Sequence, residues 1–499
     1  MSALLAAAPI ALVILAMTLW RWGAAGAGLL GLATTFVISI AGFGLGTRVL
    51  GEVGPAAATA GAFLEAIFTA GAILWIILPA LCIHELQAQS GAFETLKRAL
   101  SRFGSNPRIV ALLVAWFFAL FLEGVAGFGT PVALAAPILV GLGFTPVRAV
   151  TLTLVGHAAG VSFGAVGTPI LPQMAATGLS GLELARSAGL LHAGLGIILT
   201  GFLVRLAGDS PPQLREWIYG ALAALLFFAP FLAFAWFVGP ELPTVGGAIL
   251  GGTAFALITR RASESVGAKG PSTRDILHAA LPYLTVVALV LLTRLAPPLR
   301  GGLQSVVWDW TLLDTFTGRI EPLYHPGTIL FMSFVIGGLL QGHSPTSIAC
   351  AATRAARRLA PVVIGLFAML ALSRLMVHAD MIQSLAEAAA TLGPAWPFFA
   401  PFIGVLGTFV TGSATSSNIL FSNFQEATAT SLALPVATLQ GAQNFGAAVG
   451  NIVCPHNIIA GGATVGLAGR EGEVLRKTAV ACLTYAAAGG LLIVWLVKF

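Results

Sequence analysis

Long apolar runs alternate with short polar segments along most of the chain. A run of about 20 apolar residues can cross a bilayer as a helix. Spanning helices are therefore expected at 2–20, 23–47, 54–83, 147–176, 185–206, 216–238, 244–260, 276–293, 327–341, 360–376, 430–466 and 477–497. Two further apolar stretches, 109–144 and 396–426, are interrupted near the middle by Gly, Ser, Thr and Pro. The pattern predicts an all-α polytopic membrane protein with about twelve transmembrane helices.

The composition supports a membrane protein embedded in a lipid bilayer. Of the 499 residues, 57% are apolar and only 9% are charged, whereas a soluble domain carries about 25% charged residues. The chain has too little charge to cover its apolar cores with a wet surface. This argues against a soluble enzyme, a disordered protein and a partner of nucleic acid.

The placement of Lys and Arg predicts the topology, because these residues collect in cytoplasmic loops. Four clusters are expected in the cytoplasm: Lys97, Arg98, Arg102 and Arg108; Arg260, Arg261, Lys269 and Arg274; Arg354, Arg357 and Arg358; and Arg470, Arg476 and Lys477. All four share one side only if 109–144 and 396–426 each enter and leave by the same face. We therefore interpret these two stretches as re-entrant hairpins, with both chain termini outside and an external loop at 294–326.

The predicted elements occur in the same order twice, with opposite orientations in the membrane. We divide the chain into an N-terminal transmembrane helix (1–22), a first repeat (23–206), linking helices and an external loop (207–326), and a second repeat (327–499). Paired interruptions in two inverted halves are typical of the binding site of a secondary transporter. The N-termini of broken helices present free N–H groups and partial positive charge, which suit a carboxylate.

Three segments at and after these interruptions resemble the lactate permease family. The sequence LEGVAGFGTPVALAAPILVGLGF at 122–144 resembles its first hairpin, and VLGTFVTGSATSSNILFSNFQEATA at 405–429 resembles its second. The sequence at 450–478 is similar to its C-terminal block. The resemblance implies proton symport of lactate and related 2-hydroxy-monocarboxylates such as glycolate, in the inner membrane. It also implies a homodimer with an elevator motion.

The sequence differs from the family pattern at four positions. Ala414 stands where an acidic residue is usual, Asn451 where a basic residue is usual, and His157 where Asn is usual. Arg374 adds a charge inside an apolar run. Ala414, Asn451 and Arg374 keep a second hypothesis open, namely a carrier of another organic anion, such as a dicarboxylate or sulfonate, with sodium as an alternative coupling ion.

Glu123 and His157 are the candidates for proton coupling. A carboxylate at the bilayer centre is costly, and such a group is functional by default. The alternative for Glu123 is a helix cap that binds the following N–H groups, and the alternative for His157 is a hydrogen-bonded core residue. Glu65 is left open as the partner of a buried cation or as a proton carrier.

The candidates for substrate binding are the small and polar residues at the interruptions and one cation inside an apolar run. They are Gly127, Gly129, Thr130, Ser413, Thr415, Ser416, Asn418, Asn444, Asn451 and Arg374. The alternative for the glycines is close helix packing, and for the hydroxyl groups it is satisfaction of the broken backbone. The alternative for Arg374 is a side chain that reaches the outer membrane surface.

Two further functional classes remain open on the sequence alone. A polytopic membrane enzyme would use Ser162 as a nucleophile with His157, and a channel would conduct without accumulation. The duplicated inverted halves favour the transporter over both classes. No metal-ligand motif is recognised in the sequence, and no cofactor is expected.

Overall fold

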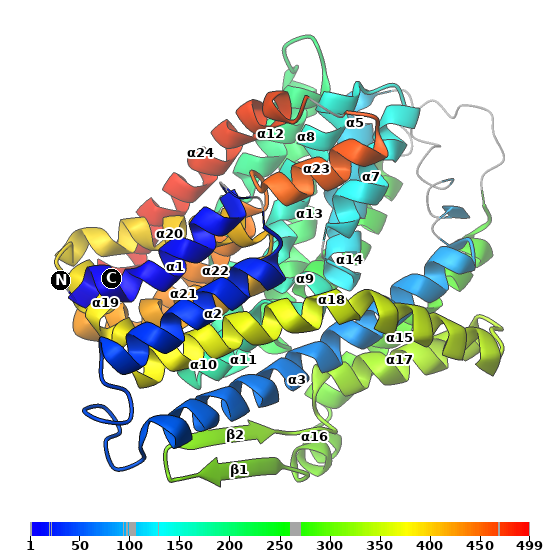
Figure 1. Cartoon of the computed structure of the whole chain (residues 1–499). Coiled ribbons are helices and arrows are strands. Elements are labelled where there is room, and N and C mark those ends of the chain that lie inside the picture. Colours follow the sequence, from blue (N-terminus) through cyan, green and yellow to red (C-terminus); the bar gives the residue numbers. More distant parts are fainter. Residues whose placement is uncertain are drawn as a thin grey trace.

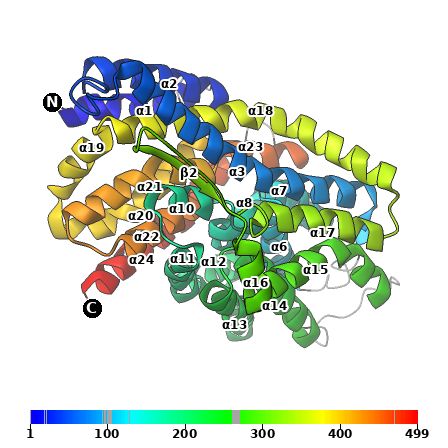
Figure 2. The same ribbon diagram turned by 90° about the horizontal axis from the view of Figure 1, so that it is seen from below.

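The computed structural model describes residues 2–18, 20, 22–92, 94, 95, 98, 106–127, 129–259, 271–467 and 470–498. The described chain is mostly helical, and its longest helices, α3 (Pro55–Gln89) and α18 (Pro345–His378), run side by side across the molecule (Figures 1 and 2). Six described helices are long and apolar enough to span a membrane, or eight if two bent pairs each count as one span. The chain is therefore an integral membrane protein, and the expected total of about twelve crossings stays a prediction.

The first half of the chain, up to the middle linking region, consists of successive helices. Their bounds are α1 (Ser2–Thr18), α2 (Ala24–Ala41), α3, α5 (Pro107–Ala111), η2 (Leu112–Phe118), α6 (Ala119–Val125), α7 (Thr130–Gly141), α8 (Pro146–His157), η3 (Ala158–Phe163), α9 (Gly164–Gly167), α10 (Ile170–Thr177), α11 (Gly181–Leu195) and α12 (Ile197–Ala207).

The middle region and the second half complete the fold. Their bounds are α13 (Leu214–Phe237), α14 (Pro243–Thr259), α15 (Thr273–Leu295), α16 (Pro297–Gln304), β1 (Trp308–Leu312), β2 (Phe316–Ile320), α17 (Pro326–Leu340), α18, α19 (Met381–Ala390), η5 (Gly393–Ala395), α20 (Trp396–Thr411), α21 (Ala414–Ser431), α22 (Val436–Gly450), α23 (Pro455–Thr464) and α24 (Glu471–Lys498). The start of α1 and the end of α24 lie at the same end of the molecule (Figure 1).

Both interrupted apolar stretches contain two helices that contact each other across a short break. In the first, helical structure runs from Pro107 to Val125 and resumes at Thr130, and α7 contacts both α6 and η2. In the second, α20 and α21 contact each other across Gly412 and Ser413. The breaks fall where the sequence predicts interruptions, while the entry of each pair through one membrane face stays a prediction.

The helix after each pair approaches the first helix of that pair through a glycine. A Cβ atom at Gly156 of α8 would lie 1.8 Å from the carbonyl oxygen of Ala115 in η2. A Cβ atom at Gly446 of α22 would lie 1.8 Å from the carbonyl oxygen of Pro401 in α20. Small residues allow such backbone contact where no hydrophobic effect drives helices together in a bilayer. In both cases the helix that follows the pair therefore packs at backbone distance against the first helix of that pair.

The segment between α16 and α17 departs from the prediction of an all-α chain. Strands β1 and β2 pair antiparallel, with Leu312 opposite Phe316, and Leu313 and Asp314 of the turn have positive φ angles. The ring of Phe316 is buried against α3, where a Cβ atom at Gly61 would lie 2.3 Å from it. Aromatic and β-branched residues on both sides of Asp314 were the available signal for this hairpin.

Helix α18 also extends beyond the span expected at 360–376. It begins at Pro345 and includes Arg354, Arg357 and Arg358, which were predicted to lie in a cytoplasmic loop. The side chains of Arg354 and Arg357 are exposed. A helix can continue past the bilayer with its charges in water, and hydropathy alone therefore locates the apolar part of this helix but not its start.

Candidate functional site

A small cavity lies between the two helix breaks. Its volume is about 40 Å³, which leaves room for a few water molecules at about 10–15 Å³ each. It is lined by Glu123, Gly127, Gly129, Val161, Gly164, Ala165, Thr168, Pro169, Gly412, Ser413, Ala414, Thr415 and Asn451. These residues come from both interrupted stretches and from the breaks after α8 and α22, so the cavity joins the two halves of the chain.

Two helices begin at the cavity wall. Gly129, with a φ of +77°, precedes α7, and Gly412, with a φ of +76°, ends α20 just before α21. The Ser413 side chain caps α21 by accepting a hydrogen bond of 3.3 Å from the N–H of Ser416. Because helix N-termini carry partial positive charge and unpaired N–H groups, this wall is suited to an anion.

A strained backbone segment forms a third wall. Ala165 and Val166 both adopt left-handed φ angles, of 42° and 55°, where residues with a side chain rarely occur. The kink interrupts the helix that begins at α8 and places Gly164, Ala165, Thr168 and Pro169 on the cavity. Such strain persists where the surrounding structure imposes it and is common at functional sites. None of these four residues was among the predicted site residues, although Gly164 and Ala165 belong to an FGAVG sequence at 163–167 that resembles FGAAVG at 445–450.

Glu123 lines the cavity and has few polar neighbours. Its side chain is buried, and a Cβ atom at Gly164 would lie 2.2 Å from its Oε1 atom. His157 Nε2 lies 3.9 Å from Glu123 Oε2, beyond hydrogen-bonding distance. The Nδ1 atom of His157 is 2.7 Å from the carbonyl oxygen of Thr153 and donates its proton there. In the neutral tautomer, the lone pair of His157 Nε2 therefore faces Glu123.

The break between α22 and α23 closes the remaining side. Asn457 donates a hydrogen bond of 2.8 Å to Asn451 Oδ1, and Asn451 donates one of 3.3 Å to the Ala447 carbonyl. A Cβ atom at Gly129 would lie 3.2 Å from Asn457 Oδ1, and one at Gly412 would lie 3.3 Å from His456 Cβ. The first turn of α23 therefore contacts both breaks at once.

The structure brings half of the predicted site residues to this cavity. Glu123, Gly127, Gly129, Ser413, Thr415 and Asn451 line it. The other six do not line it: Thr130, Ser416, Asn418, Asn444, Arg374 and His157. Of these, His157 faces Glu123. In the conformation described, the structure thus gives no support for direct substrate contact by the members of the second group.

Asn418 and Asn444 are fully buried and bind protein groups. Asn418 donates to the Pro169 carbonyl at 2.9 Å and to Asn444 Oδ1 at 3.0 Å. Asn444 in turn donates to the Ser162 carbonyl at 3.4 Å. These bonds connect α21 and α22 to the kinked segment of the first half. The pair therefore braces the walls of the cavity.

Ser162 has a different histidine partner from the one that the enzyme hypothesis requires. Its Oγ atom lies 2.8 Å from His192 Nε2, and His192 Nδ1 lies 2.9 Å from the Tyr485 hydroxyl. Ser162 and His192 are both fully buried, and neither lines the cavity. A nucleophile needs access to a substrate carbonyl, so this arrangement does not support the proposed pairing of Ser162 with His157.

Arg374 belongs to an ionic cluster between α3 and α18. Its Nε atom is 3.8 Å from Glu65 Oε2, and its Nη2 atom donates a hydrogen bond of 3.0 Å to the Ala175 carbonyl at the end of α10. His378 Nε2 lies 2.8 Å from the same Glu65 oxygen, and the N–H of Thr317 in β2 donates to Glu65 Oε1 at 3.0 Å. Glu65, left open by the sequence, thus has a cationic partner.

We expect Arg374→Gln to lower stability while leaving substrate affinity nearly unchanged. The substitution removes an ion pair and a hydrogen bond, which should cost about 1–3 kcal/mol. The KM for transport should stay within about twofold, because Arg374 does not line the cavity. Thermal unfolding and uptake kinetics measure the two effects separately. Arg186→Gln is the control, since Arg186 donates to the Trp236 carbonyl on another surface. A tenfold rise in KM without loss of stability would instead make Arg374 a substrate ligand.

Solved structures with a similar fold are membrane transporters. MtrF of Neisseria gonorrhoeae, described as an antimetabolite efflux pump, has a TM-score of 0.50 and 14% identity, covering 87% of this chain and 82% of its own. The YdaH transporter of Alcanivorax borkumensis has a TM-score of 0.50 and 17% identity, covering 87% of each chain. At these identities the likeness concerns the fold. Together with the apolar helices, it defines a multi-pass helical membrane protein.

The chain belongs to the L-lactate permease family, whose model matches residues 2–320 and 316–499. An L-lactate permease of Streptococcus iniae is 32% identical over 86% of this chain and 91% of its own. The glycolate permease GlcA of Escherichia coli is 28% identical over 99% and 95%, and the L-lactate permease of that bacterium is 28% identical over 81% of each. These relatives are permeases, so the chain is a transporter and not an enzyme.

Proposed function

We propose that the chain takes up lactate, glycolate and similar 2-hydroxy-monocarboxylates by proton symport through the cavity between the two helix breaks. The names of the relatives support the substrate class. The observation that carries the mechanism is the buried Glu123 carboxyl, which lies in the same cavity as the N-termini of α7 and α21. One wall thus suits a substrate anion, and the lining also includes a group that can carry a proton.

The lining favours an anion with a single charge. No Lys or Arg is found among the described residues that line the cavity, so the helix N-termini and hydroxyl groups would bind the carboxylate. Ser413 and Thr415 supply hydroxyl groups, and Asn451 supplies an amide. A dicarboxylate would add a second charge without a cationic partner, which is costly in a buried site. This supports a monocarboxylate over the dicarboxylate alternative.

Coupling follows from the charges in the cavity. With Glu123 ionised and His157 neutral, the empty site is negative, and it repels a second anion. One proton on Glu123, or shared with His157, neutralises the pair. Proton binding then favours substrate binding, and by linkage the substrate favours the proton to the same extent. The loaded carrier moves one proton with each monocarboxylate.

The two halves would supply the alternating access that symport requires. We propose that 109–144 and 396–426 are re-entrant hairpins of an inverted repeat, and that their breaks separate in turn toward each membrane face. The small volume of the cavity supports this proposal, because the two breaks must separate before the substrate can enter. A homodimer with an elevator motion is the assembly that we propose for this cycle.

The proposal is tested by uptake of labelled lactate into proteoliposomes with and without an inward proton gradient. We expect an acidic exterior to drive accumulation above that of protein-free vesicles, with competition by unlabelled glycolate. A sodium gradient at equal internal and external pH should drive none. Accumulation that depends on sodium would refute proton coupling. Uptake of a sulfonate or dicarboxylate in place of lactate would refute the substrate assignment.

A further inference from the structure

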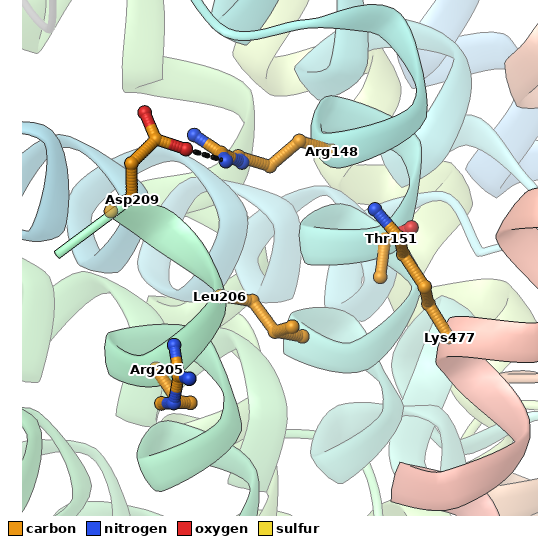
Figure 3. A pocket seen from close by; sticks show the side chains of 7 residues that line it. Arg148, Thr151, Arg205, Leu206, Asp209 and Lys477 are labelled. Carbon is orange, nitrogen blue, oxygen red and sulfur yellow. Dashed lines mark hydrogen bonds and ion pairs between the residues drawn. The ribbon is translucent and has the colours of Figure 1, made fainter. Parts of the chain in front are cut away.

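A second cavity, far larger than the first, lies where α8, α12 and α24 meet. Its volume is about 200 Å³, and it is lined by Arg148, Thr151, Arg205, Leu206, Gly208, Asp209 and Lys477. Figure 3 shows these side chains around an open space, with Arg148 and Asp209 on one side of it and Lys477 on the other. None of its residues lines the cavity at the helix breaks. It is therefore a separate feature of the fold.

The charges of this cavity are unbalanced. Arg148 forms an ion pair with Asp209, and this hydrogen-bonded contact lowers the pKa of the Asp209 carboxyl. Arg205 and Lys477 form no ion pair with a carboxylate in the described part of the chain, although Lys477 lies in the electrostatic field of Glu473. Three cations thus surround a space that one carboxylate lines. A fork-shaped guanidinium and an ammonium together suit a phosphate group, which offers several oxygen atoms.

The wall of this cavity is held in place by a buried arginine. Arg108 forms an ion pair of 2.7 Å with Glu216 and donates hydrogen bonds to the carbonyl groups of Val204 and Ser210. A Cβ atom at Gly208 would lie 2.6 Å from Arg108 Nη2. These contacts fix the turn after α12, which carries Asp209. The end of α12, which carries Arg205, and the turn that carries Asp209 are therefore held in place.

Exposed apolar side chains occur near the cavity on α24 and on α13, which packs against α12. Val480 and Leu483 follow Lys477 on α24, and both are 58% exposed. Trp217 packs beside Gly201, one turn before Arg205 on α12, and exposes 41% of its surface. Tryptophan is enriched at membrane interfaces, and basic pockets between helices on the cytoplasmic side bind anionic lipid headgroups. The charge pattern predicts that this end of the molecule faces the cytoplasm.

We propose that the cavity formed by Arg148, Arg205 and Lys477 binds a phosphate-bearing anion, either the headgroup of an anionic phospholipid or free phosphate. A bound phosphate would contact α8 and α12 of the first half and α24 of the second. It would therefore stabilise the contact between the halves at a place distant from the transported substrate.

The test uses the purified full-length protein and measures binding by native mass spectrometry. The probes are phosphatidylglycerol, phosphatidylcholine with the same acyl chains, and inorganic phosphate. If the ligand is a lipid headgroup, phosphatidylglycerol should bind more tightly than phosphatidylcholine, and inorganic phosphate should not displace the phosphatidylglycerol. If the ligand is free phosphate, inorganic phosphate should bind in the absence of lipid and should displace bound phosphatidylglycerol. Equal binding of both lipids with no binding of phosphate would overturn the proposal.

Matched variants locate the binding to this cavity. Arg205→Gln and Lys477→Gln should each weaken binding of the preferred probe by about fivefold, as expected for one basic residue near an anionic surface. Arg476→Gln removes the neighbouring exposed charge, which does not line the cavity, and should change binding by less than twofold. Lys477→Arg should retain binding and shows that the position tolerates substitution. If Arg476→Gln and Lys477→Gln weaken binding equally, the binding depends on general surface charge, and the proposed site is refuted.

Discussion

In proteoliposomes that contain Glu123→Gln, an imposed pH gradient is expected to drive no accumulation of lactate. A gradient of one pH unit corresponds to 1.36 kcal/mol and supports at most about tenfold accumulation in one-to-one symport. The native protein should approach this limit, and the variant should stay at the level of protein-free vesicles, which report the passive entry of lactic acid. The physical reason is that Gln has the shape of the protonated acid but cannot release a proton.

The same substitution should preserve exchange of lactate across the membrane. Because the amide keeps the cavity neutral, the substrate can still bind, and preloaded vesicles should exchange labelled for unlabelled lactate. Loss of accumulation together with retained exchange separates coupling from folding. The control is Glu426→Gln, since Glu426 lies in α21 but does not line the cavity, and it should behave as the native protein does. Tenfold accumulation by Glu123→Gln would refute the role of Glu123.

Alanine at Gly446 or Gly156 should prevent stable packing of the corresponding half. Each new methyl group would lie 1.8 Å from a backbone carbonyl oxygen, of Pro401 or of Ala115, and neither carbonyl can move without displacing its helix. Overpacking of this kind typically costs about 1–3 kcal/mol, and contact with backbone places both variants at or above the upper end of that range. The loss of stability is measured by heating the protein in detergent and determining, by size-exclusion chromatography, the fraction that stays folded.

Gly141→Ala is the matched control for these variants. Gly141 ends α7, and a Cβ atom there would meet nothing within 4 Å. Alanine is favoured over glycine in a helix by about 1 kcal/mol at most, so the control should be as stable as the native protein or slightly more so. A loss of stability in only one of the two variants would contradict the inference that α8 and α22 perform the same packing role. Unchanged stability in both variants would contradict the close approach itself.

The alternating pattern of apolar and polar segments was sufficient to predict a helical membrane protein and the places where its helices break. Both breaks occur where Gly, Ser and Thr interrupt an apolar stretch, because these residues relax the steric and hydrogen-bonding demands of a continuous helix. The motifs at 122–144 and 405–429 were also sufficient to indicate the family, which the match over the chain confirms. Glu123 stood out for an equally local reason, namely a carboxyl group within an apolar stretch.

Contacts between distant segments were decided only by the tertiary structure. Gly164 and Ala165 lie on the cavity because a kink turns this segment toward Glu123, and no local pattern specifies that direction. Arg374 lies beside Glu65, which is distant in the sequence, and Asn418 binds a carbonyl of the first half instead of lining the cavity. Hydropathy and helix-breaking residues act over neighbouring positions. A side chain's partner depends on how whole helices cross, and that is a property of the packed chain.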